Sequence, residues 1–346
     1  MCVTCSSTFK KTSHYKSGFN SLHSLTAIIC FLSPPFMAGG LSHFHGRPSF
    51  LTISRSNPSR PSLCHRPITI NMTQTQTQSQ TQSYWTSIEA DIAAHLKRAI
   101  PIRPPVSVFE PMHYLTFAAP RITASALCIA ACELVGGDRD QAMAAASALH
   151  LMHAAAYTHE HLPLTDRIRP KPAIHHAYSP NVELLTGDGI IPFGLELLAK
   201  SIVKNGSNSD RILRVIVEIT RAVGSEGVVD GQYKEFLCSQ SKGEESWNLG
   251  DIEYVCKKKE GGLYACGAAC GAILGGGSEE EVQKLRKYGL YVGMIEGMLY
   301  GVGRNKKGME GEVEKLRGLA TKELEIFNGR KIEKICSLVQ AGLCSV

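Results

Sequence analysis

Residues 152–172 restrict the fold more than any other stretch, because an apolar helical pattern there runs into ionisable groups and then stops. Small and apolar side chains recur at helical spacing between Met152 and Ala156. The ionisable groups follow at residues 159–161. Pro163 then ends the helix, because proline lacks an amide donor and clashes with the preceding turn. Ionisable groups at the end of an apolar helix are typical of an active site.

The rest of the chain shows the same helical periodicity and no convincing alternation of apolar and polar residues. We therefore expect an all-α fold, a bundle of about ten or more helices around a central cavity. A capping box at Thr86-x-x-Glu89 predicts the start of the first helix. Asp138 and Ser278 are expected to cap two later helices. Residues 251–274 are expected to form a single helix.

The beginning of the chain has a different composition. The first acidic residue is Glu89, and seven basic residues precede it. A Ser-rich segment with Lys and Arg but no acids is typical of an organellar transit peptide, so residues 1–72 are interpreted as a transit peptide or disordered segment. The apolar run at 25–32 leaves a secretory signal open as an alternative. The Thr/Gln repeat at 73–83 is interpreted as a polar linker, and 84–346 as the folded domain.

The net charge of +6 comes from this N-terminal segment. The rest of the chain contains 30 basic and 31 acidic side chains, so no basic surface for nucleic acid is expected. No apolar run approaches the ~20 residues of a membrane span, so no transmembrane segment is expected.

Several long runs match one protein family. From about Ser83 onward the chain resembles trans-prenyltransferases of the geranylgeranyl diphosphate synthase type. The matching runs are LCIAACELVGGD at 127–138, the helix around His153, VELLTGDGIIPFGLELLA at 182–199, Gly231-Gln232, and CGAILGGGSEEEVQKLRKYG at 270–289. The resemblance implies the all-α isoprenoid synthase (trans-prenyltransferase) helical bundle.

Catalysis in that family needs Mg²⁺ ions, which hold the negative charge that develops on a departing diphosphate. Two aspartate-rich motifs on facing helices bind the ions. The resemblance places the first motif, DDxxxxD, on Glu160, His161 and Asp166. It places the second, DDxxD, on Tyr300, Gly301 and Arg304. A Tyr, a Gly and an Arg cannot supply a Mg²⁺ site. The resemblance therefore implies that this chain has no bound metal and no catalytic residue.

The residues that contact diphosphate in the family are also reduced. Arg121 stands where a Lys is typical, and Ile122 and Ala124 stand where two Arg are typical. His153 matches the family, and Lys259 takes the place of the family's Lys. The resemblance thus leaves Arg121, His153 and Lys259 as residual diphosphate contacts, although a solvated face is the alternative for the Lys run.

Within the family, the segment Thr158–Asp166 is similar to the plant small-subunit group of geranyl diphosphate synthase. That similarity implies a non-catalytic partner of a catalytic geranylgeranyl diphosphate synthase in the plastid stroma. Such a subunit shifts the partner's product toward geranyl diphosphate, a monoterpene precursor. It binds no cofactor itself, and Mg²⁺ is expected in the catalytic partner. Heterodimer and heterotetramer both stay open.

Two CxxxC motifs add to this similarity, with the thiols at Cys128 and Cys132 and at Cys266 and Cys270. Cysteines at i and i+4 share a helix face, and the Ala and Gly residues between them let another helix approach closely. We interpret the four thiols as partner-binding residues. Buried core thiols are the alternative, and a four-thiolate zinc site is a weaker one.

Two further functions remain open from the sequence. The chain could be a stand-alone prenyltransferase with an unusual metal site at Glu160 and Asp166, or a module that binds an isoprenoid without chemistry. The histidines near the helix end could also bind a transition metal, but we interpret them as a remnant of the ancestral site.

Overall fold

The structure is a computed structural model. It describes residues 72–163, 176–205, 209–242, 247–304, 306–330 and 332–340. All of them lie in one compact unit, Ile68–Val346. The segment interpreted as a transit peptide, apart from Met72, lies outside the described residues. So do Asp166 and residues 341–346.

The described residues form helices and no strand, which confirms the all-α prediction. The helices are α1 (Met72–Ala99), α2 (Val106–Ala118), α3 (Thr123–Leu134), α4 (Arg139–His161), α5 (Pro180–Asn205), α6 (Ser209–Val223), α7 (Val228–Lys242), α8 (Leu249–Lys258), α9 (Glu260–Gly275), α10 (Glu279–Tyr300), α11 (Glu310–Glu323), the 3-10 turn η2 (Glu325–Phe327) and α12 (Glu333–Gln340).

The capping predictions have mixed outcomes. Asp138 and Ser278 each begin a helix with a capping box, as predicted. The start predicted at Thr86 is wrong, because α1 already begins at Met72. The repeat at 73–83, interpreted as a linker, is therefore helical. The physical reason is that no Gly or Pro interrupts α1, and Gln is a good helix former.

The single helix predicted at 251–274 is also wrong, because the structure has two helices there. Lys259 separates α8 from α9 with a non-helical backbone (φ −87°, ψ −94°). The sequence pattern did not reveal this break, because apolar periodicity continues on both sides of it. The break has a consequence for the site, since it sets the direction of the Lys259 side chain.

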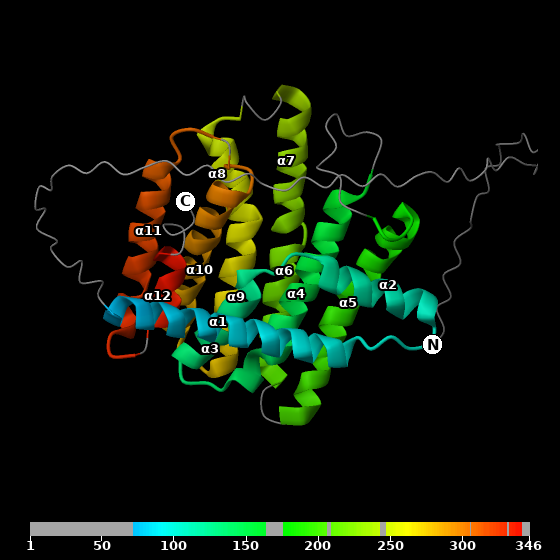
Figure 1. Cartoon of the computed structure of the whole chain (residues 1–346), viewed down its shortest axis with the longest axis horizontal. Helices are drawn as coiled ribbons and strands as arrows, with labels where there is room; N and C mark the ends of the chain where they lie inside the picture. The colour runs from blue at the N-terminus through cyan, green and yellow to red at the C-terminus, as the bar shows by residue number, and fades with distance from the viewer. Residues whose placement is uncertain are drawn as a thin grey trace, which may run out of the picture. The chain divides into compact units, whose positions relative to one another are not determined.

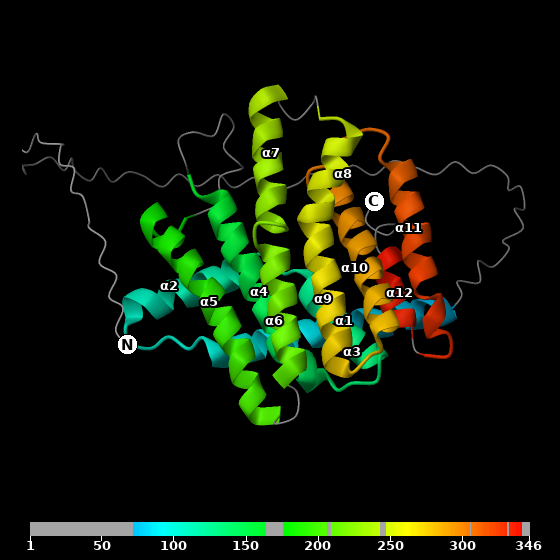
Figure 2. The ribbon, with the colours of Figure 1, turned by 180° about the vertical axis from the view of Figure 1, so that it is seen from behind.

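The helices pack in layers around the central pair of α3 and α9. Helix α3 packs on α9, α9 packs on α10, and α4 packs on α5. In Figures 1 and 2, α1 and α2 lie across a set of roughly parallel helices that includes α4, α5, α9 and α10. Nearly every residue of α3 is buried, and so is most of α9. The pair therefore forms the centre of the core.

Glycines on one face of α9 allow the close approach of α3. A Cβ atom on Gly271 would lie 1.9 Å from the Cys128 carbonyl oxygen. One turn earlier, a Cβ atom on Gly267 would lie 2.3 Å from the Ala124 carbonyl oxygen. Both separations are too short for any side chain, so the two backbones are in direct contact.

Among the described residues, no single helix has the length and apolar character needed to cross a membrane. The bent pair α2 and α3 passes the same test by length and composition. Because α3 is a buried core helix, its apolar character is accounted for by packing within the bundle.

Candidate functional site

The predicted site residue Lys259 lies at the break between α8 and α9. Its backbone N–H donates to the carbonyl oxygen of Val255, at 2.9 Å, which completes the last turn of α8. Its side chain then leaves the helical path and is largely buried. A lysine ammonium is costly to bury unless it is paired with carboxylates.

Two carboxylates pair with it. The Lys259 Nζ atom donates to Glu160 Oε1 at 2.8 Å and to Glu235 Oε2 at 2.6 Å. Glu160 comes from the last turn of α4, and Glu235 comes from α7. The three side chains are only 11%, 16% and 14% exposed for Lys259, Glu160 and Glu235 respectively. The cluster therefore ties three parts of the fold together through one buried cation.

A glycine on α7 makes room for the lysine stem. A Cβ atom on Gly231 would lie 2.8 Å from Lys259 Cγ and 2.9 Å from Lys258 Cβ. Gly231 and Glu235 lie one turn apart on α7, so one face of this helix both admits the stem and meets its ammonium.

The other predicted residues of the first motif lie at the end of α4. The helix stops at His161, just before Pro163, as predicted. The His161 Nδ1 atom lies 2.8 Å from the Tyr157 carbonyl oxygen, and the two rings lie 4.1 Å apart. His161 thus caps its own helix. Glu160 is brought to Lys259, whereas Asp166 lies outside the described residues.

The predicted second motif supplies no acidic ligand. Helix α10 ends at Tyr300, and Tyr300, Gly301 and Arg304 are all exposed. The part of the chain that the structure describes contains no group of three or more His, Cys, Asp or Glu side chains that could hold a metal ion. Because the second-motif positions offer no carboxylate, the described residues do not fit the Mg²⁺ site that the family resemblance implies.

His153 and Arg121 have different surroundings. Burial, together with the charges of the nearby His150 and Lys259, lowers the pKa of His153 to about 4, against a backbone hydrogen bond to Pro120 that raises it. The His153 Nε2 atom is buried and has no hydrogen-bond partner among the described residues. Arg121, by contrast, is exposed and pairs with Glu89 at 2.8 Å. Diphosphate contact by His153, Arg121 or Lys259 stays a prediction.

Sequence reasoning missed Glu235. The only signal was the matching dipeptide Gly231-Gln232, which lies one turn earlier on the same helix. Glu235 is 75 residues from Glu160 in the sequence, so no local pattern joins them.

The four cysteines predicted to bind a partner are buried in the core of this chain. Cys128 and Cys132 on α3, and Cys266 and Cys270 on α9, are all buried at the contact of these two helices. The Cys266 and Cys270 sulfur atoms lie 3.7 Å apart. Burial raises the pKa of Cys128 well above its usual value and that of Cys132 to about 12. The thiols thus have a packing role within this chain, and direct partner contact stays a prediction.

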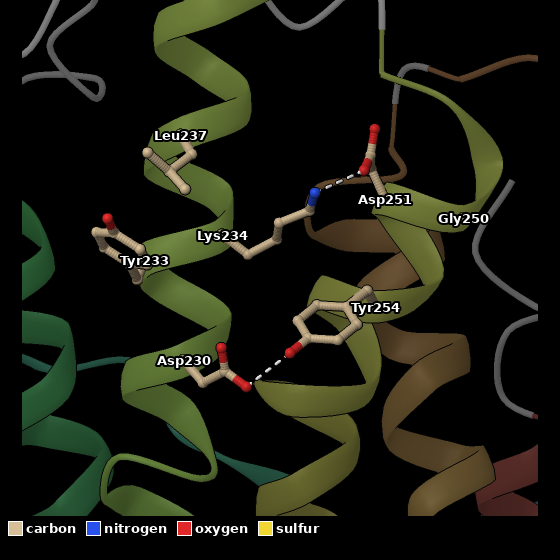
Figure 3. A pocket seen from close by; sticks show the side chains of 7 residues that line it. All are labelled: Asp230, Tyr233, Lys234, Leu237, Gly250, Asp251 and Tyr254. Carbon is tan, nitrogen blue, oxygen red and sulfur yellow. Dashed lines mark hydrogen bonds and ion pairs between the residues drawn. The ribbon is translucent and has the colours of Figure 1, made fainter.

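An open pocket of about 430 Å³ lies between α7 and α8 (Figure 3). Lys234 pairs with Asp251 at 2.9 Å across it, and the Tyr254 hydroxyl donates to Asp230 at 2.7 Å. Asp230 also pairs with Lys258 at 2.9 Å, so each charged side chain of the pocket already has a counter-charge.

The fold and the site together define a class. The molecule is an all-α bundle with ionisable groups at the end of a long helix, where two carboxylates pair with a buried lysine. The chain belongs to the polyprenyl synthetase family, whose profile matches residues 106–295.

Particular relatives narrow this class. The chain is 55% identical over 279 residues to the "heterodimeric geranylgeranyl pyrophosphate synthase small subunit 2, chloroplastic" of Cannabis sativa, covering 80% of this chain and 97% of that protein. It is 61% identical to the solved geranyl diphosphate synthase small subunit of Antirrhinum majus, with a TM-score of 0.70 and coverage of 75% of this chain and 98% of that one.

A third match is a solved chain described as a mint deletion mutant of heterotetrameric geranyl pyrophosphate synthase. It is 56% identical, with a TM-score of 0.67, and covers 74% of this chain and 98% of that one. These matches confirm the expected isoprenoid synthase bundle and the resemblance to small subunits. The chloroplastic name of the Cannabis relative agrees with the organellar targeting expected from the N-terminal composition.

Proposed function

We propose that this chain is the non-catalytic regulatory subunit of a heteromeric geranyl diphosphate synthase in the plastid stroma. It binds a catalytic geranylgeranyl diphosphate synthase and shifts that partner's product to geranyl diphosphate for monoterpene synthesis. By itself it condenses no prenyl diphosphates and binds no cofactor. Mg²⁺ belongs to the catalytic partner.

One observation carries this proposal. The fold of a prenyl synthase is intact, but the carboxylates of α4 and α7 bind Lys259, and the end of α10 presents Tyr300, Gly301 and Arg304. A departing diphosphate needs metal ions or comparable cations to hold its charge. A chain with this scaffold and without this chemistry is suited to act through a partner.

The proposed partner is a catalytic member of the same family. The names of the Cannabis, Antirrhinum and mint relatives describe small subunits or heteromeric synthases. A regulatory subunit can shorten the product by favouring release from the partner over further elongation. We propose that this chain acts in that way.

The names of the relatives also support a second candidate. Two Cannabis relatives, 55% and 50% identical, are named as small subunits of geranylgeranyl pyrophosphate synthase. The alternative function is therefore a subunit that supports the longer product. The two candidates differ in product length, which a direct assay measures.

The test is a paired assay. The full chain, a plant geranylgeranyl diphosphate synthase, and the mixture of both are supplied with isopentenyl and dimethylallyl diphosphates and Mg²⁺. Product length is read by chromatography, and association by light scattering. We expect a silent lone chain and geranyl diphosphate from the mixture. A mixture that associates and makes only geranylgeranyl diphosphate supports the second candidate.

Two controls separate the remaining functions. If the lone chain makes product, the double variant Glu160→Ala with Asp166→Ala should abolish it, and the stand-alone enzyme replaces our proposal. If an isoprenoid diphosphate raises the melting temperature of the lone chain and no synthase associates with it, the isoprenoid-binding module is the better description.

A further inference from the structure

A second pocket, of about 440 Å³, lies where α1, the end of α3 and α12 meet. Helix α12 packs on both α1 and α3, on one side of the bundle (Figures 1 and 2). The lining residue Gly136 lies just before the start of α4, whereas Glu160 lies in the last turn of that helix, roughly 30 Å further along it. The pocket is therefore separate from the cluster around Lys259.

The pocket contains a cation that has no counter-charge. Lys334 is exposed, and no carboxylate of the described residues pairs with it. Its ammonium lies over the Tyr84 ring, 3.9 Å from the ring centroid. Arg330, the other cation of the lining, pairs with Glu281 at 2.7 Å. An anion that enters the pocket would therefore meet the uncompensated charge of Lys334.

Tyr84 stays neutral beside this ammonium. Its hydroxyl donates to Glu133 Oε2 at 2.6 Å. Burial raises the pKa of Tyr84 well above its usual value, and the hydrogen bond to Glu133 raises it further. The second oxygen of Glu133, Oε1, accepts from Arg139 Nε at 3.0 Å. Both oxygens of this carboxylate are therefore already engaged, and Lys334 interacts with the face of a neutral ring, which is a weak partner.

The rest of the wall is mostly apolar. It consists of Ala130, Leu134, Val135 and Ile335. The edge of the pocket is open at Gly136, where a Cβ atom would meet nothing within 4 Å. Small-molecule sites have volumes of about 300–1,000 Å³, apolar walls and a few polar groups that fix the ligand's orientation. The pocket has this size and this composition.

We propose that this pocket binds an amphipathic anion with a short apolar chain. The anionic head contacts Lys334, and the chain lies against the apolar wall of α3 and α12. Prenyl diphosphates and short fatty acids share this chemistry. A bound ligand would join α1, α3 and α12, far from the ionisable groups at the end of α4. The choice of geranyl diphosphate as one probe rests on the proposed function, whereas the pocket itself does not.

Trp85 is a built-in reporter of binding. Its ring packs edge-on against Tyr84, with 5.2 Å between the ring centroids, and its Nε1 donates to Ser337 of α12 at 3.1 Å. The chain has two tryptophans, and the indole N–H of the other, Trp247, has no hydrogen-bond partner among the described residues. Trp247→Phe therefore breaks no such bond and leaves a fluorescence signal from Trp85 alone.

Geranyl diphosphate, decanoate and inorganic diphosphate are titrated into the full chain with Trp247→Phe, in the presence of a chelator. Decanoate has the same number of carbons as the geranyl group. We expect an amphipathic probe to change the Trp85 fluorescence, and inorganic diphosphate to bind at least about 10-fold more weakly because it buries no apolar surface. A response to geranyl diphosphate alone identifies a prenyl diphosphate site, and a response to decanoate alone identifies a fatty-acid site.

Lys334→Gln tests where the probe binds. We expect it to weaken binding at least about 10-fold, which is typical for the loss of a hydrogen bond to a charged group. Lys334→Arg should keep most of the affinity. Lys315→Gln is the matched control, because Lys315 is also exposed and pairs with Glu312 in its own helix. It should bind like the parent chain, and melting curves should show that all three variants are folded.

The proposal is overturned if neither amphipathic probe binds, by fluorescence or by calorimetry with the wild-type full chain. Equal affinity of the parent chain and Lys334→Gln would also overturn it, because the probe would then bind elsewhere, for example near His153. So would equal affinity for geranyl diphosphate and inorganic diphosphate. These measurements use the chain alone, whereas the product shift needs the catalytic partner, so the two failures are distinguishable.

Discussion

His153 has an imidazole that burial keeps neutral. Its folded-state pKa is about 4, against 6.5 for an unperturbed histidine. Between these values the unfolded chain binds a proton that the folded chain excludes, so folding stability falls as pH falls from about 6.5 towards 4. From the two pKa values, we expect a loss of about 2 kcal/mol between pH 7 and pH 5 from this residue. Urea unfolding at both pH values measures it.

The variant His153→Asn provides the control, because it removes the titrating group and keeps a polar side chain of smaller size. Other groups also titrate in this range, His150 among them, since burial lowers its pKa as well. The informative quantity is therefore the difference in pH dependence between wild type and variant. Identical pH dependence in both chains would contradict the neutral, buried His153.

The site residues were only partly predictable from the sequence. Glu160 and Lys259 were both predicted as site residues, because each lies in a recognisable run. That they pair with each other could not be predicted, since 99 residues separate them and Lys259 was expected inside a continuous helix. Glu235 was missed for the same reason, because its partner is supplied by another helix.

At the scale of elements, the contact of α3 with α9 gives a clear prediction. Gly271→Ala places a methyl group 1.9 Å from the Cys128 carbonyl oxygen, so the two helices must separate. We expect a loss of unfolding free energy of about 3 kcal/mol or more, at the upper end of overpacking effects. Denaturant unfolding measures it.

Gly318→Ala is the matched control, because Gly318 lies in the interior of α11 and a Cβ atom there meets nothing within 4 Å. Alanine is the better helix former, so this variant should be neutral or more stable by up to about 1 kcal/mol. Equal effects of the two substitutions would mean that α3 and α9 are not in backbone contact.

The CxxxC motifs give a second prediction at this scale. In the free chain, Cys128 and Cys270 are buried. Burial raises the pKa of Cys128, and the hydrogen bond with Cys266 together with burial raises that of Cys270, so little reactive thiolate is available. We expect both to stay unmodified under alkylation conditions that modify the partly exposed Cys336. Mass spectrometry of the peptides reads this out. Equal modification of all three would favour an open helix face that a partner covers.

Helix existence was predicted well, and helix ends less well. Local capping chemistry at Asp138 and Ser278 located two starts correctly. The start of α1 and the continuity of the chain through Lys259 were predicted wrongly, for two different reasons. A polar repeat becomes helical when nothing interrupts it, and a helix breaks where a buried side chain must reach partners on other helices.

For the whole molecule, the unit that begins at Ile68 predicts how truncation acts. We expect a chain that starts at Ile68 to melt like the full chain. A chain that starts at Tyr84 should melt nearly as high, because residues 80–83 are mostly exposed. A chain that starts at Pro101 should melt at least about 10 °C lower, because it loses four buried side chains of α1: Trp85, Ile88, Ile92 and Leu96.

Thermal unfolding of the three truncated chains beside the full chain tests this order. The linker interpretation of residues 73–83 is tested by the first two, since a linker can be removed without effect. A large loss on removal of these residues would instead show that the first turns of α1 contribute to the core.

The direct backbone contact of α3 with α9 has a mechanical consequence. Ordinary helix pairs slide on a layer of side chains, which absorbs small displacements by changing rotamers. Between α3 and α9 that layer is missing at Gly267 and Gly271, so the two helices move as one rigid unit. A displacement of α3 would therefore be transmitted to the first residues of α9. Because α9 begins next to Lys259, the ion pairs of Lys259 with Glu160 and Glu235 would move with the two helices.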